Sequence, residues 1–333
     1  MSFIKTVAAV AAGAFLLTSP ATAQQSLKFS TIVPDGSVWH RMMQNYAQLV
    51  AQYSNNELAV EIFPGGQLGA QDATLSQAVR GRIEIWGGAF PVLAAVKPEL
   101  APLFFPGMFE SDAQANCVIP QMVEPTRAVL ADVGHFVGFV PLGWQDLAAV
   151  NELTTMQDIV GQSIRSVPIP TAVALWRTLG LTPVAMDAAE TTTALSTGMV
   201  TLTDQALSFW VASGQAELTP HFYPTHNYYS AGAVLIGNRT WEGFTDAQRE
   251  ALTRAGDEGW NYAATSQVFA GFTARLSEMA AQRGGIIHEV SDEDRAWIRA
   301  AGETLWEPTL TQLGAGARAY FDAIQAAKAN CPA

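Results

Sequence analysis

The sequence predicts an α/β protein with two lobes, each built on a mostly parallel sheet that is flanked by helices. Between residues 27 and 86, segments with strand-like alternation are separated by segments with helical spacing of apolar residues, in the order β-α-β-α-β. The same order recurs between residues 163 and 203. Strands that alternate with helices indicate parallel pairing through right-handed crossovers. Because 333 residues exceed what one simple core usually holds, each βαβαβ unit is expected to form its own lobe.

In the first unit, turn and cap residues separate the expected elements. Ser37 can cap a helix whose apolar side chains fall on one face, and Gly81 can end the next helix. Residues 87–90 are expected at the carboxyl edge of the sheet, where glycines let a backbone approach a ligand closely. The expected strands are 27–33, 58–63, 82–86 and 136–142, and the expected helices are 38–53, 70–80 and 115–133.

The second unit is followed by a segment of helical periodicity that runs from Thr245 to about Gln282. A helix of that length would span roughly 55 Å, more than one lobe of this size, so it must cross both lobes or break. Gly256, Gly259 and Gly271 are the places where it could kink. The other expected elements are strands at 163–167, 183–186, 199–203, 230–237 and 286–290, helices at 171–179 and 191–196, and further helices after 291.

These elements divide the chain into two lobes, since the strand at 230–237 is expected to return the chain to the first lobe. We expect lobe I to hold residues 24–143 and 230–265, and lobe II to hold residues 144–229 and 266–298. Residues 299–333 are expected to form C-terminal helices that pack back on the lobes.

The first 23 residues have the form of a secretory signal peptide, with Lys5, an apolar run at 7–17 and a small-residue cleavage site at Ala21-Thr22-Ala23. The run is too short to span a membrane, and no later stretch is long and apolar enough. We therefore expect a periplasmic protein that does not insert into the membrane, and we expect a monomer. The surplus of 30 acidic over 18 basic side chains, with no basic patch, excludes nucleic acid as a partner.

Two cysteines, Cys117 and Cys331, remain after this leader. In an oxidising compartment such a pair most simply forms a disulfide. It would tie the C-terminus to the first lobe and close a very long loop, which stabilises by roughly 4 kcal/mol in the chain-entropy model. Two unpaired thiols are the alternative, because a disulfide also requires suitable geometry. The spacing of the two cysteines does not match a zinc or redox motif.

Arg165 is the main candidate for ligand binding. Residues 163–167 alternate as a short strand that Pro168 ends, so Arg165 lies near the carboxyl end of a strand, where ligands of open α/β sheets sit. A guanidinium keeps its charge, and its rigid fork suits a carboxylate. We interpret Arg165 as the anchor for the acid group of a small solute. The alternative is a structural role, in which Arg165 pairs with Asp187 or Glu190 across a βα turn.

No motif in the sequence favours catalysis or a cofactor. The five histidines are scattered without an i, i+4 pair, and no Cys/His cluster occurs, so we expect no metal site. No Gly-x-Ser-x-Gly elbow and no phosphate loop is found. Asp187 and Glu190 could act as bases only if they converged on a substrate, so a periplasmic enzyme that acts on a small acid is the alternative from a different class.

Five stretches carry a further signal: 64–69 (PGGQLG), 161–165, 183–198, Phe209-Trp210 and 237–244 (GNRTWEGF). In order and spacing over nearly the whole chain they resemble the periplasmic solute-binding subunits of tripartite ATP-independent periplasmic (TRAP) transporters, the DctP-like proteins. The resemblance implies a periplasmic binding protein fold, with a hinge and a long bridging helix between the lobes. It also implies closure around a small organic acid and delivery of that acid to the membrane subunits of the transporter.

In that family the arginine that corresponds to Arg165 usually grips the ligand carboxylate. Residues 143–150 lack the second arginine that many relatives carry after a Gly-Trp pair. The usual Glu-Asn pair falls near Asp204-Gln205, which makes Gln205 a candidate contact. A dicarboxylate or a sialic-acid type of ligand is therefore less well supported by the resemblance.

Aromatic residues complete the candidate site. Trp210, Tyr228 and Tyr229 match positions where ectoine-binding relatives place rings around a compact cationic ring, although each ring could equally belong to an ordinary core. Rings suit an apolar or cationic body, so a monocarboxylate with an aromatic, cyclic or zwitterionic body agrees with the pattern as well as a sugar acid does. Trp144 and Phe90 are added because they are expected at strand ends that face the cleft.

A binding protein for an ABC importer or for a sensor kinase is a second alternative. The expected bridging helix and the stretch at 238–244 favour the TRAP class over these two.

Overall fold

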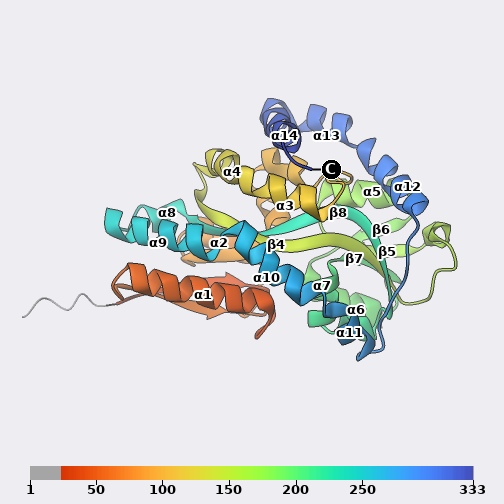
Figure 1. Cartoon of the computed structure of the whole chain (residues 1–333), viewed down its shortest axis with the longest axis horizontal. Helices are drawn as coiled ribbons and strands as arrows, with labels where there is room; N and C mark the ends of the chain where they lie inside the picture. The colour runs from red at the N-terminus through yellow and green to blue at the C-terminus, as the bar shows by residue number, and fades with distance from the viewer. Residues whose placement is uncertain (1–23, 333) are drawn as a thin grey trace, which may run out of the picture.

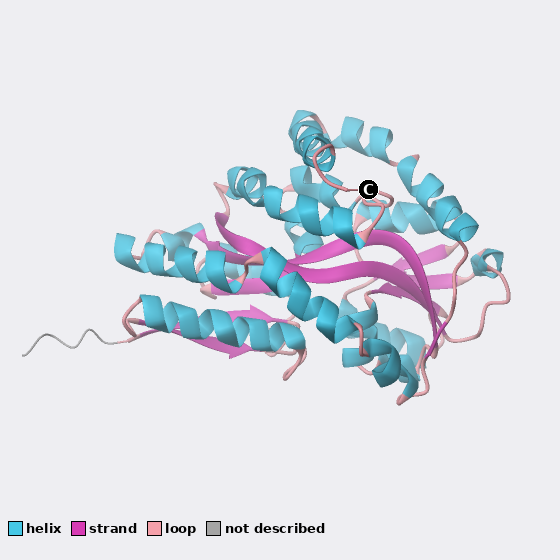
Figure 2. Cartoon of the chain, in the orientation of Figure 1, coloured by secondary structure: helices cyan, strands magenta, loops and turns pink. Residues whose placement is uncertain are grey.

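A computed structural model describes residues 24–332, apart from the side chains of residues 262–264, and the predicted signal peptide lies outside the described residues. One mixed sheet runs through the protein with helices on both faces (Figures 1 and 2). Its strand order is β2-β1-β3-β8-β4-β7-β5-β6, and β9 pairs with β8. The strands are β1 (Gln25–Thr31), β2 (Leu58–Phe63), β3 (Ile85–Ala89), β4 (Gly134–Ala149), β5 (Ser163–Ser166), β6 (Thr182–Ala185), β7 (Leu202–Gln205), β8 (His221–Gly237) and β9 (Ile286–Ile287).

The helices cover both faces of this sheet, and short 3₁₀ turns (η) connect some of them (Figure 2). The α-helices are α1 (Val38–Tyr53), α2 (Gln71–Val79), α3 (Asp112–Gln121), α4 (Val123–Leu130), α5 (Pro170–Thr178), α6 (Thr191–Ser196), α7 (Leu207–Ala212), α8 (Asn238–Trp241), α9 (Asp246–Gly259), α10 (Tyr262–Thr273), α11 (Leu276–Ala281), α12 (Asp292–Glu303), α13 (Trp306–Leu313) and α14 (Ala315–Lys328). The 3₁₀ helices are η1 (Phe90–Ala95), η2 (Pro98–Phe104), η3 (Met156–Ile159), η4 (Ala188–Glu190) and η5 (Gln215–Glu217).

Two long antiparallel strands, β4 and β8, join the two halves of the sheet. At one end β8 pairs with β3, which continues into the parallel strands β1 and β2. At the other end β4 pairs with β7, which continues into the parallel strands β5 and β6. The prediction of an α/β fold with a mostly parallel sheet in each lobe is therefore confirmed, and β4 and β8 add the antiparallel centre. The lobe boundaries at residues 143/144 and 229/230 remain a prediction.

Both central strands are about twice as long as the sequence predicted, since β4 continues beyond residue 142 and β8 begins before residue 230. The predicted strand ended at Leu142, and the residues that follow include Gly143 and Asp146, residue types that turns commonly contain. Tertiary pairing overrides this signal, since the second half of β4 hydrogen-bonds to β7 and β8 on its two edges. The pairing of β4 with β8 shifts register between Pro141 and Gly143 and again between Gln145 and Leu147, so the strand continues with bulges. Gly143 adopts a left-handed φ of 90°.

The long helix expected from Thr245 to about Gln282 is broken into α9, α10 and α11. Thr245 caps α9, as the sequence predicted, and the first break follows directly after Gly259, one of the three expected kink sites. The series packs on α1 of the first half at its start and on α7 of the second half at its end (Figure 1). Of the two outcomes expected from the sequence, one continuous helix or a break, the break is found, and three helices in series bridge the halves. Among the described residues, no helix is long and apolar enough to span a membrane.

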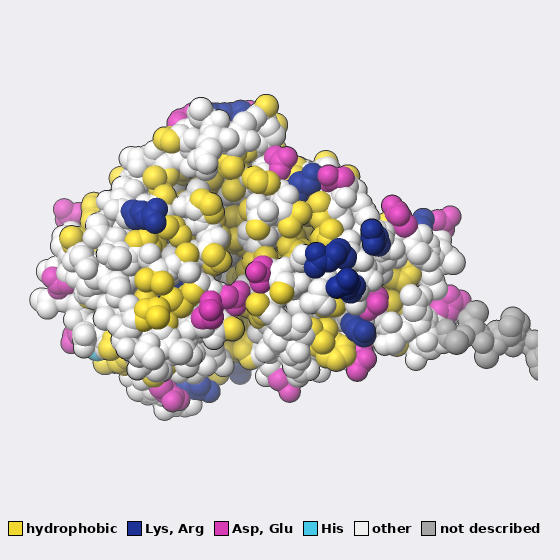
Figure 3. Space-filling view, turned by 180° about the vertical axis from the view of Figure 1, so that it is seen from behind, with side chains coloured by type: hydrophobic (Ala, Val, Ile, Leu, Met, Phe, Trp, Pro, Cys, Tyr) yellow, Lys and Arg dark blue, Asp and Glu magenta, His cyan; other side chains and the backbone are white. Residues whose placement is uncertain are grey.

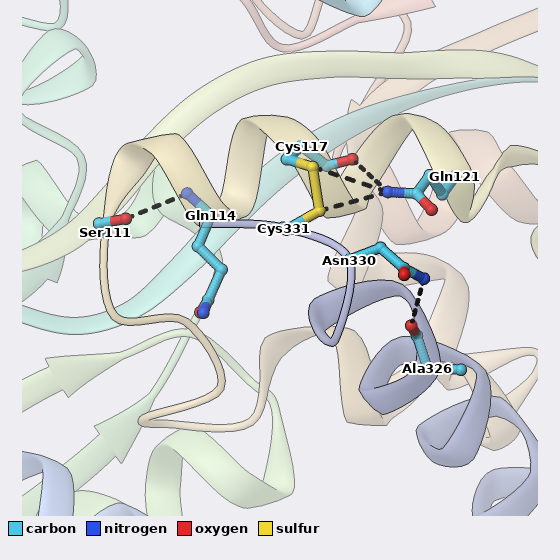
Figure 4. The surroundings of a disulfide bond; sticks show 7 residues. All are labelled: Ser111, Gln114, Cys117, Gln121, Ala326, Asn330 and Cys331. Carbon is cyan, nitrogen blue, oxygen red and sulfur yellow. Dashed lines mark hydrogen bonds between the residues drawn. A yellow bond between two sulfur atoms is a disulfide. The ribbon is translucent and has the colours of Figure 1, made fainter. Parts of the chain in front are cut away.

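The C-terminal helices contact both halves. α12 packs on β8 and α5, whereas α14 packs on α3 and η2 (Figure 1). A disulfide joins Cys117 of α3 to Cys331, three residues after the end of α14 (Figure 4). The side-chain amide of Gln121 donates to the Cys117 carbonyl at 2.9 Å and lies against both sulfur atoms. The predicted disulfide is confirmed, and it holds the C-terminal helices against the first half of the sheet.

We predict that the double substitution Cys117→Ser/Cys331→Ser lowers the thermal unfolding midpoint. The disulfide spans 214 positions in the sequence, and in the chain-entropy model closing so long a loop stabilises the fold by on the order of 4–5 kcal/mol. Circular dichroism melting curves measure the difference. A reductant should lower the midpoint of the unsubstituted protein and leave that of the double variant in place. Equal midpoints for the two proteins under oxidising conditions would contradict the prediction.

Candidate functional site

A cavity of about 820 Å³ opens between the two halves of the sheet, because its walls come from both of them. From the first half, β3, η1 and the start of α1 contribute, and from the second half β5, β7 and the turns that follow them contribute. Residues of β4 and β8 form the wall between these groups, and α13 borders the cavity. In Figure 3, which shows the molecule from behind, apolar side chains gather along a hollow in the middle of the face.

Arg165 lies on β5 at the wall of this cavity and is only 4% exposed. Its Nη1 atom donates to the backbone carbonyl and to the Oδ1 atom of Asp204, at 3.2 and 3.3 Å. Its Nη2 atom donates to the Met186 carbonyl at 3.0 Å, and its Nε atom is buried without a hydrogen-bond partner among the described residues. A guanidinium has five N–H groups, so Nε–H and one Nη2–H have no acceptor in these interactions.

The partner of Arg165 is fully buried. Asp204 also accepts from the backbone N–H of Val167 on Oδ1, and from the Trp176 indole N–H and the Tyr228 hydroxyl on Oδ2. Burial raises the pKa of the Asp204 carboxyl, whereas Arg165 and the other donors act to lower it. Because hydrogen-bond donors reach both oxygens of Asp204 and Arg165 cannot lose its proton, we describe Asp204 as a carboxylate in a buried ion pair with Arg165.

Asp204, and not Asp187 or Glu190, is thus the acid that pairs with Arg165. Asp187 and Glu190 were the partners expected across a βα turn, but β7 is the neighbour of β5 in the sheet, and Arg165 lies opposite Thr203. Asp187 and Glu190 instead cap the start of η4, where Asp187 Oδ1 accepts from Ala189 N–H and Glu190 Oε2 accepts from Asp187 N–H.

Three of the seven predicted site residues line the cavity together: Arg165, Gln205 and Tyr228. Gln205 follows Asp204 at the end of β7, and its buried side-chain Nε2 atom has no hydrogen-bond partner among the described residues. Tyr228 contributes its ring, since its hydroxyl is engaged by Asp204. At the cavity wall, Arg165 and Gln205 come from strands that lie side by side, and each has a buried nitrogen without a hydrogen-bond partner among the described residues.

The other four predicted residues lie in the protein core, away from the cavity lining. Strand alternation explains two of them: Gln145 and Tyr228 form a pair that faces the cavity, so the next pair, Trp144 and Tyr229, lies on the opposite face of the sheet. There Tyr229 donates to the side-chain oxygen of Asn116 on α3. The expectation that Trp144 stands at a strand end facing the cleft is wrong, because β4 continues to Ala149.

Phe90 and Trp210 are also placed differently from the expectation. Phe90 is fully buried in a cluster of rings, and its ring centroid lies 5.0 Å from those of Phe104 and Phe139. Trp210 is fully buried on α7, where its indole N–H donates to Thr219. The neighbour of Trp210, Phe209, lines the cavity, since consecutive helix residues point in different directions.

Several lining residues carry no motif and were not predicted. Gln145 belongs to the part of β4 that lies beyond the predicted strand end, whereas Gly88 falls in the stretch that was expected to approach a ligand. Ile169, Phe209 and Leu313 look like ordinary core residues in the sequence, because only the packing of distant elements brings them to one surface.

The comparisons with known proteins agree with this architecture. The sequence model of bacterial extracellular solute-binding protein family 7, DctP, matches residues 29–312. The chain belongs to this family. The resemblance to TRAP solute-binding proteins inferred from the motifs is thereby confirmed.

Relatives and solved structures show the breadth of the DctP family. The C4-dicarboxylate-binding periplasmic protein DctP of Rhodobacter capsulatus is 25% identical over 309 residues, which are 89% of this chain and 87% of the relative. The 2,3-diketo-L-gulonate-binding periplasmic protein YiaO of Escherichia coli K12 is 24% identical over 260 residues, which are 77% of this chain and 80% of the relative. A TRAP solute-binding protein of a Bradyrhizobium species, solved with galacturonate, superimposes with a TM-score of 0.84 at 16% identity, covering 91% of this chain and 100% of the other. At that identity the structural likeness shows the fold alone.

In this DctP-family chain, a second buried acid, Asp146 of β4, lies outside the cavity lining. Asp146 accepts the backbone N–H of His226 at 2.8 Å, and His226 has a left-handed φ of 52° and stacks on Trp144. Burial raises the pKa of Asp146 to about 7; the His226 N–H lowers it, Asp112 adds to the rise and Arg295 opposes it. The bond holds the irregular part of β8 where β4 and β8 change register.

We predict that the free energy of unfolding falls less in Asp146→Asn than in the unsubstituted protein when the pH is raised from 5 to 7.5. A folded-state pKa above the ordinary value means that the native protein binds the proton of Asp146 more tightly than the unfolded chain does. The contribution of Asp146 to the free energy of unfolding is therefore present at low pH and is lost as the pH rises through about 7. Relative to the variant, the unsubstituted protein should lose on the order of 3 kcal/mol of unfolding free energy over this range.

Denaturant unfolding of both proteins at several pH values measures this difference. Burial lowers the pKa of His135 and of His226 to about 4, which makes stability rise with pH in part of the same range. Both histidines are present in both proteins, so their effects cancel in the comparison. Parallel pH profiles for the two proteins would contradict the assignment to Asp146.

Proposed function

We propose that this protein is the periplasmic solute-binding subunit of a TRAP transporter, and that it captures a small organic acid whose carboxylate is anchored by Arg165. The observation that carries the proposal is the Arg165 side chain at the cavity wall, buried and fixed by three hydrogen bonds, with its Nε–H unused. Family membership supports the transport role, and relatives named as periplasmic support the location.

The geometry of Arg165 suits this role because its fork is held before a ligand arrives. Asp204 and the Met186 carbonyl occupy three N–H groups on one part of the guanidinium. The remaining N–H groups include Nε–H, and two neighbouring N–H groups can bind the two oxygens of one carboxylate. Gln205, with an unused amide donor, supplies a further contact from the adjacent strand.

Capture is completed by closure of the two lobes. The cavity walls come from both halves of the sheet, and β4, β8 and the α9–α11 series connect these halves. A modest rotation at the crossing strands would bring the wall with η1 toward Arg165 and exclude water, which strengthens the charged hydrogen bonds. The closed, loaded protein then presents the acid to the membrane subunits of the transporter.

We predict that organic acids raise the thermal unfolding midpoint and that their uncharged amides do not. The pair 4-methylpentanoate and 4-methylpentanamide isolates the carboxylate, and the panel also contains succinate, galacturonate, cyclohexanecarboxylate and phenylacetate. Binding to the native state stabilises it by RT ln(1 + L/Kd), where L is the free ligand concentration and Kd is the dissociation constant, so the midpoint rises with the logarithm of ligand concentration once the site is saturated. If no acid of this panel shifts the midpoint of ligand-free protein, the proposed function fails.

We predict that Arg165→Lys weakens binding of the tightest acid of that panel by at least tenfold, on the order of 1.5–3 kcal/mol for a lost charged hydrogen bond. Lysine keeps the positive charge next to Asp204 but cannot present a planar fork. Isothermal titration calorimetry measures the loss, and Arg82→Lys, at an exposed arginine outside the cavity lining, is the matched control.

Arg165→Ala should abolish binding as well, but it leaves the buried Asp204 charge without its partner and should cost on the order of 3–5 kcal/mol of stability. For this reason Arg165→Lys, with its fold checked by circular dichroism, is the decisive variant. Near-native affinity in a folded Arg165→Lys protein would show that Arg165 is not the anchor.

A further inference from the structure

The charge of the cavity lining restricts which acid can be bound. Among the described residues that line the cavity, four are charged: Asp72, Arg165, Asp187 and Glu190. Arg165 is therefore the one lining cation, and it is already paired with the buried carboxylate of Asp204. The positive charge of Arg165 is thus already balanced by Asp204, and a solute carboxylate would bind only the N–H groups of Arg165 that remain unused. The other charged residues of the described lining are acidic.

The three acidic residues of the lining are engaged in local structure. Asp72 accepts the backbone N–H of Ala73 at the start of α2, and Asp187 and Glu190 hold the start of η4. The acidic side chains at these positions disfavour a second anionic group on the solute.

The remaining lining is mostly apolar. Both halves of the sheet contribute aliphatic and aromatic groups, among them Val92, Pro98, Leu142, Ile169, Phe209 and Leu313. Trp39 presents an apolar ring, because its indole N–H is used by the Pro141 carbonyl. Uncharged polar side chains, such as Gln145, Gln215 and Ser230, also line the cavity but form the smaller part of it. Some of the many hydroxyl groups of a sugar acid would therefore face apolar walls, and burying a hydroxyl without a partner is costly.

We infer that the solute is a monocarboxylate with a largely apolar body, rather than a dicarboxylate or a sugar acid. This inference rests on the proposed function, since it assumes that Arg165 receives the carboxylate. One carboxylate uses the free N–H groups of Arg165 and the Gln205 amide, and the apolar body fills the space between η1, α13 and the turn after β5.

The test is isothermal titration calorimetry of ligand-free, full-length protein with succinate and 4-methylpentanoate. These two acids have the same chain, and an isopropyl group in one replaces the second carboxylate of the other. Cyclohexanecarboxylate, phenylacetate and galacturonate complete the set. The tightest of the apolar monocarboxylates should bind at least tenfold more tightly than either succinate or galacturonate.

A second cation in the cavity should reverse the preference. Gln145 lines the cavity on β4, so Gln145→Arg would add a positive charge within the lining, and Gln145→Leu is the control that changes polarity without adding charge. Gln145→Arg should raise succinate affinity at least tenfold relative to 4-methylpentanoate, whereas Gln145→Leu should not. Thermal unfolding of both variants confirms that they are folded.

The outcomes separate this inference from the proposed function. Tighter binding of succinate or galacturonate by the unsubstituted protein, lost in Arg165→Lys, overturns the inference and leaves the Arg165 anchor in place. Binding of none of the acids overturns both. A preference for apolar monocarboxylates that Gln145→Arg leaves unchanged overturns the electrostatic explanation.

Discussion

The buried ion pair between Arg165 and Asp204 is the interaction on which the cavity depends. Arg165 is 4% exposed and Asp204 is fully buried, so neither charge is compensated by water. The buried pair is tolerated because Asp204 accepts hydrogen bonds on both carboxylate oxygens, and because Nη1 and Nη2 of Arg165 donate hydrogen bonds to three oxygens. Such a pair adds little net stability, but it fixes the orientation of the guanidinium before any solute arrives.

The sheet topology provides this pair. β5 and β7 are parallel neighbours, so their carboxyl ends meet at one edge and place Arg165 beside Asp204 and Gln205. β4 and β8 then bring the first half of the sheet opposite to this edge. The same two strands also involve the second buried acid, since Asp146 of β4 accepts the His226 N–H and holds the irregular part of β8. A candidate solute site and a structural support for the connection between the lobes thus share one strand pair.

Membership of the DctP family accounts for the architecture, but the lining of the cavity distinguishes members of the family. Relatives bear names that mention a dicarboxylate, a diketogulonate and ectoine, so the fold accepts solutes of different charge and polarity. What differs among such proteins must be the side chains around a shared scaffold. In this chain, the described residues of the lining include one paired cation and are mostly apolar.

Local pattern was sufficient to predict the order of helices and strands up to β3, the second βαβαβ unit and the caps at Ser37 and Thr245, because these depend on residues near in sequence. It was also sufficient to select Arg165, since a permanent charge at the end of an apolar strand needs a partner or a ligand. It underestimated β4 and β8, whose irregular residues are held in strands by neighbours from distant parts of the chain.

The site as a whole was decided by tertiary structure. Strand pairing selected Asp204 over Asp187 and Glu190 as the partner of Arg165, and the alternation along β4 and β8 turned Tyr228 toward the cavity and Trp144 and Tyr229 away from it. The amino-acid sequence by itself determined the fold class and the disulfide pair and singled out Arg165 as the candidate cation, because residue type and local spacing are enough for these. Which faces meet across the cavity depends on contacts between residues far apart in the chain, and these exist only after the two halves of the sheet have joined.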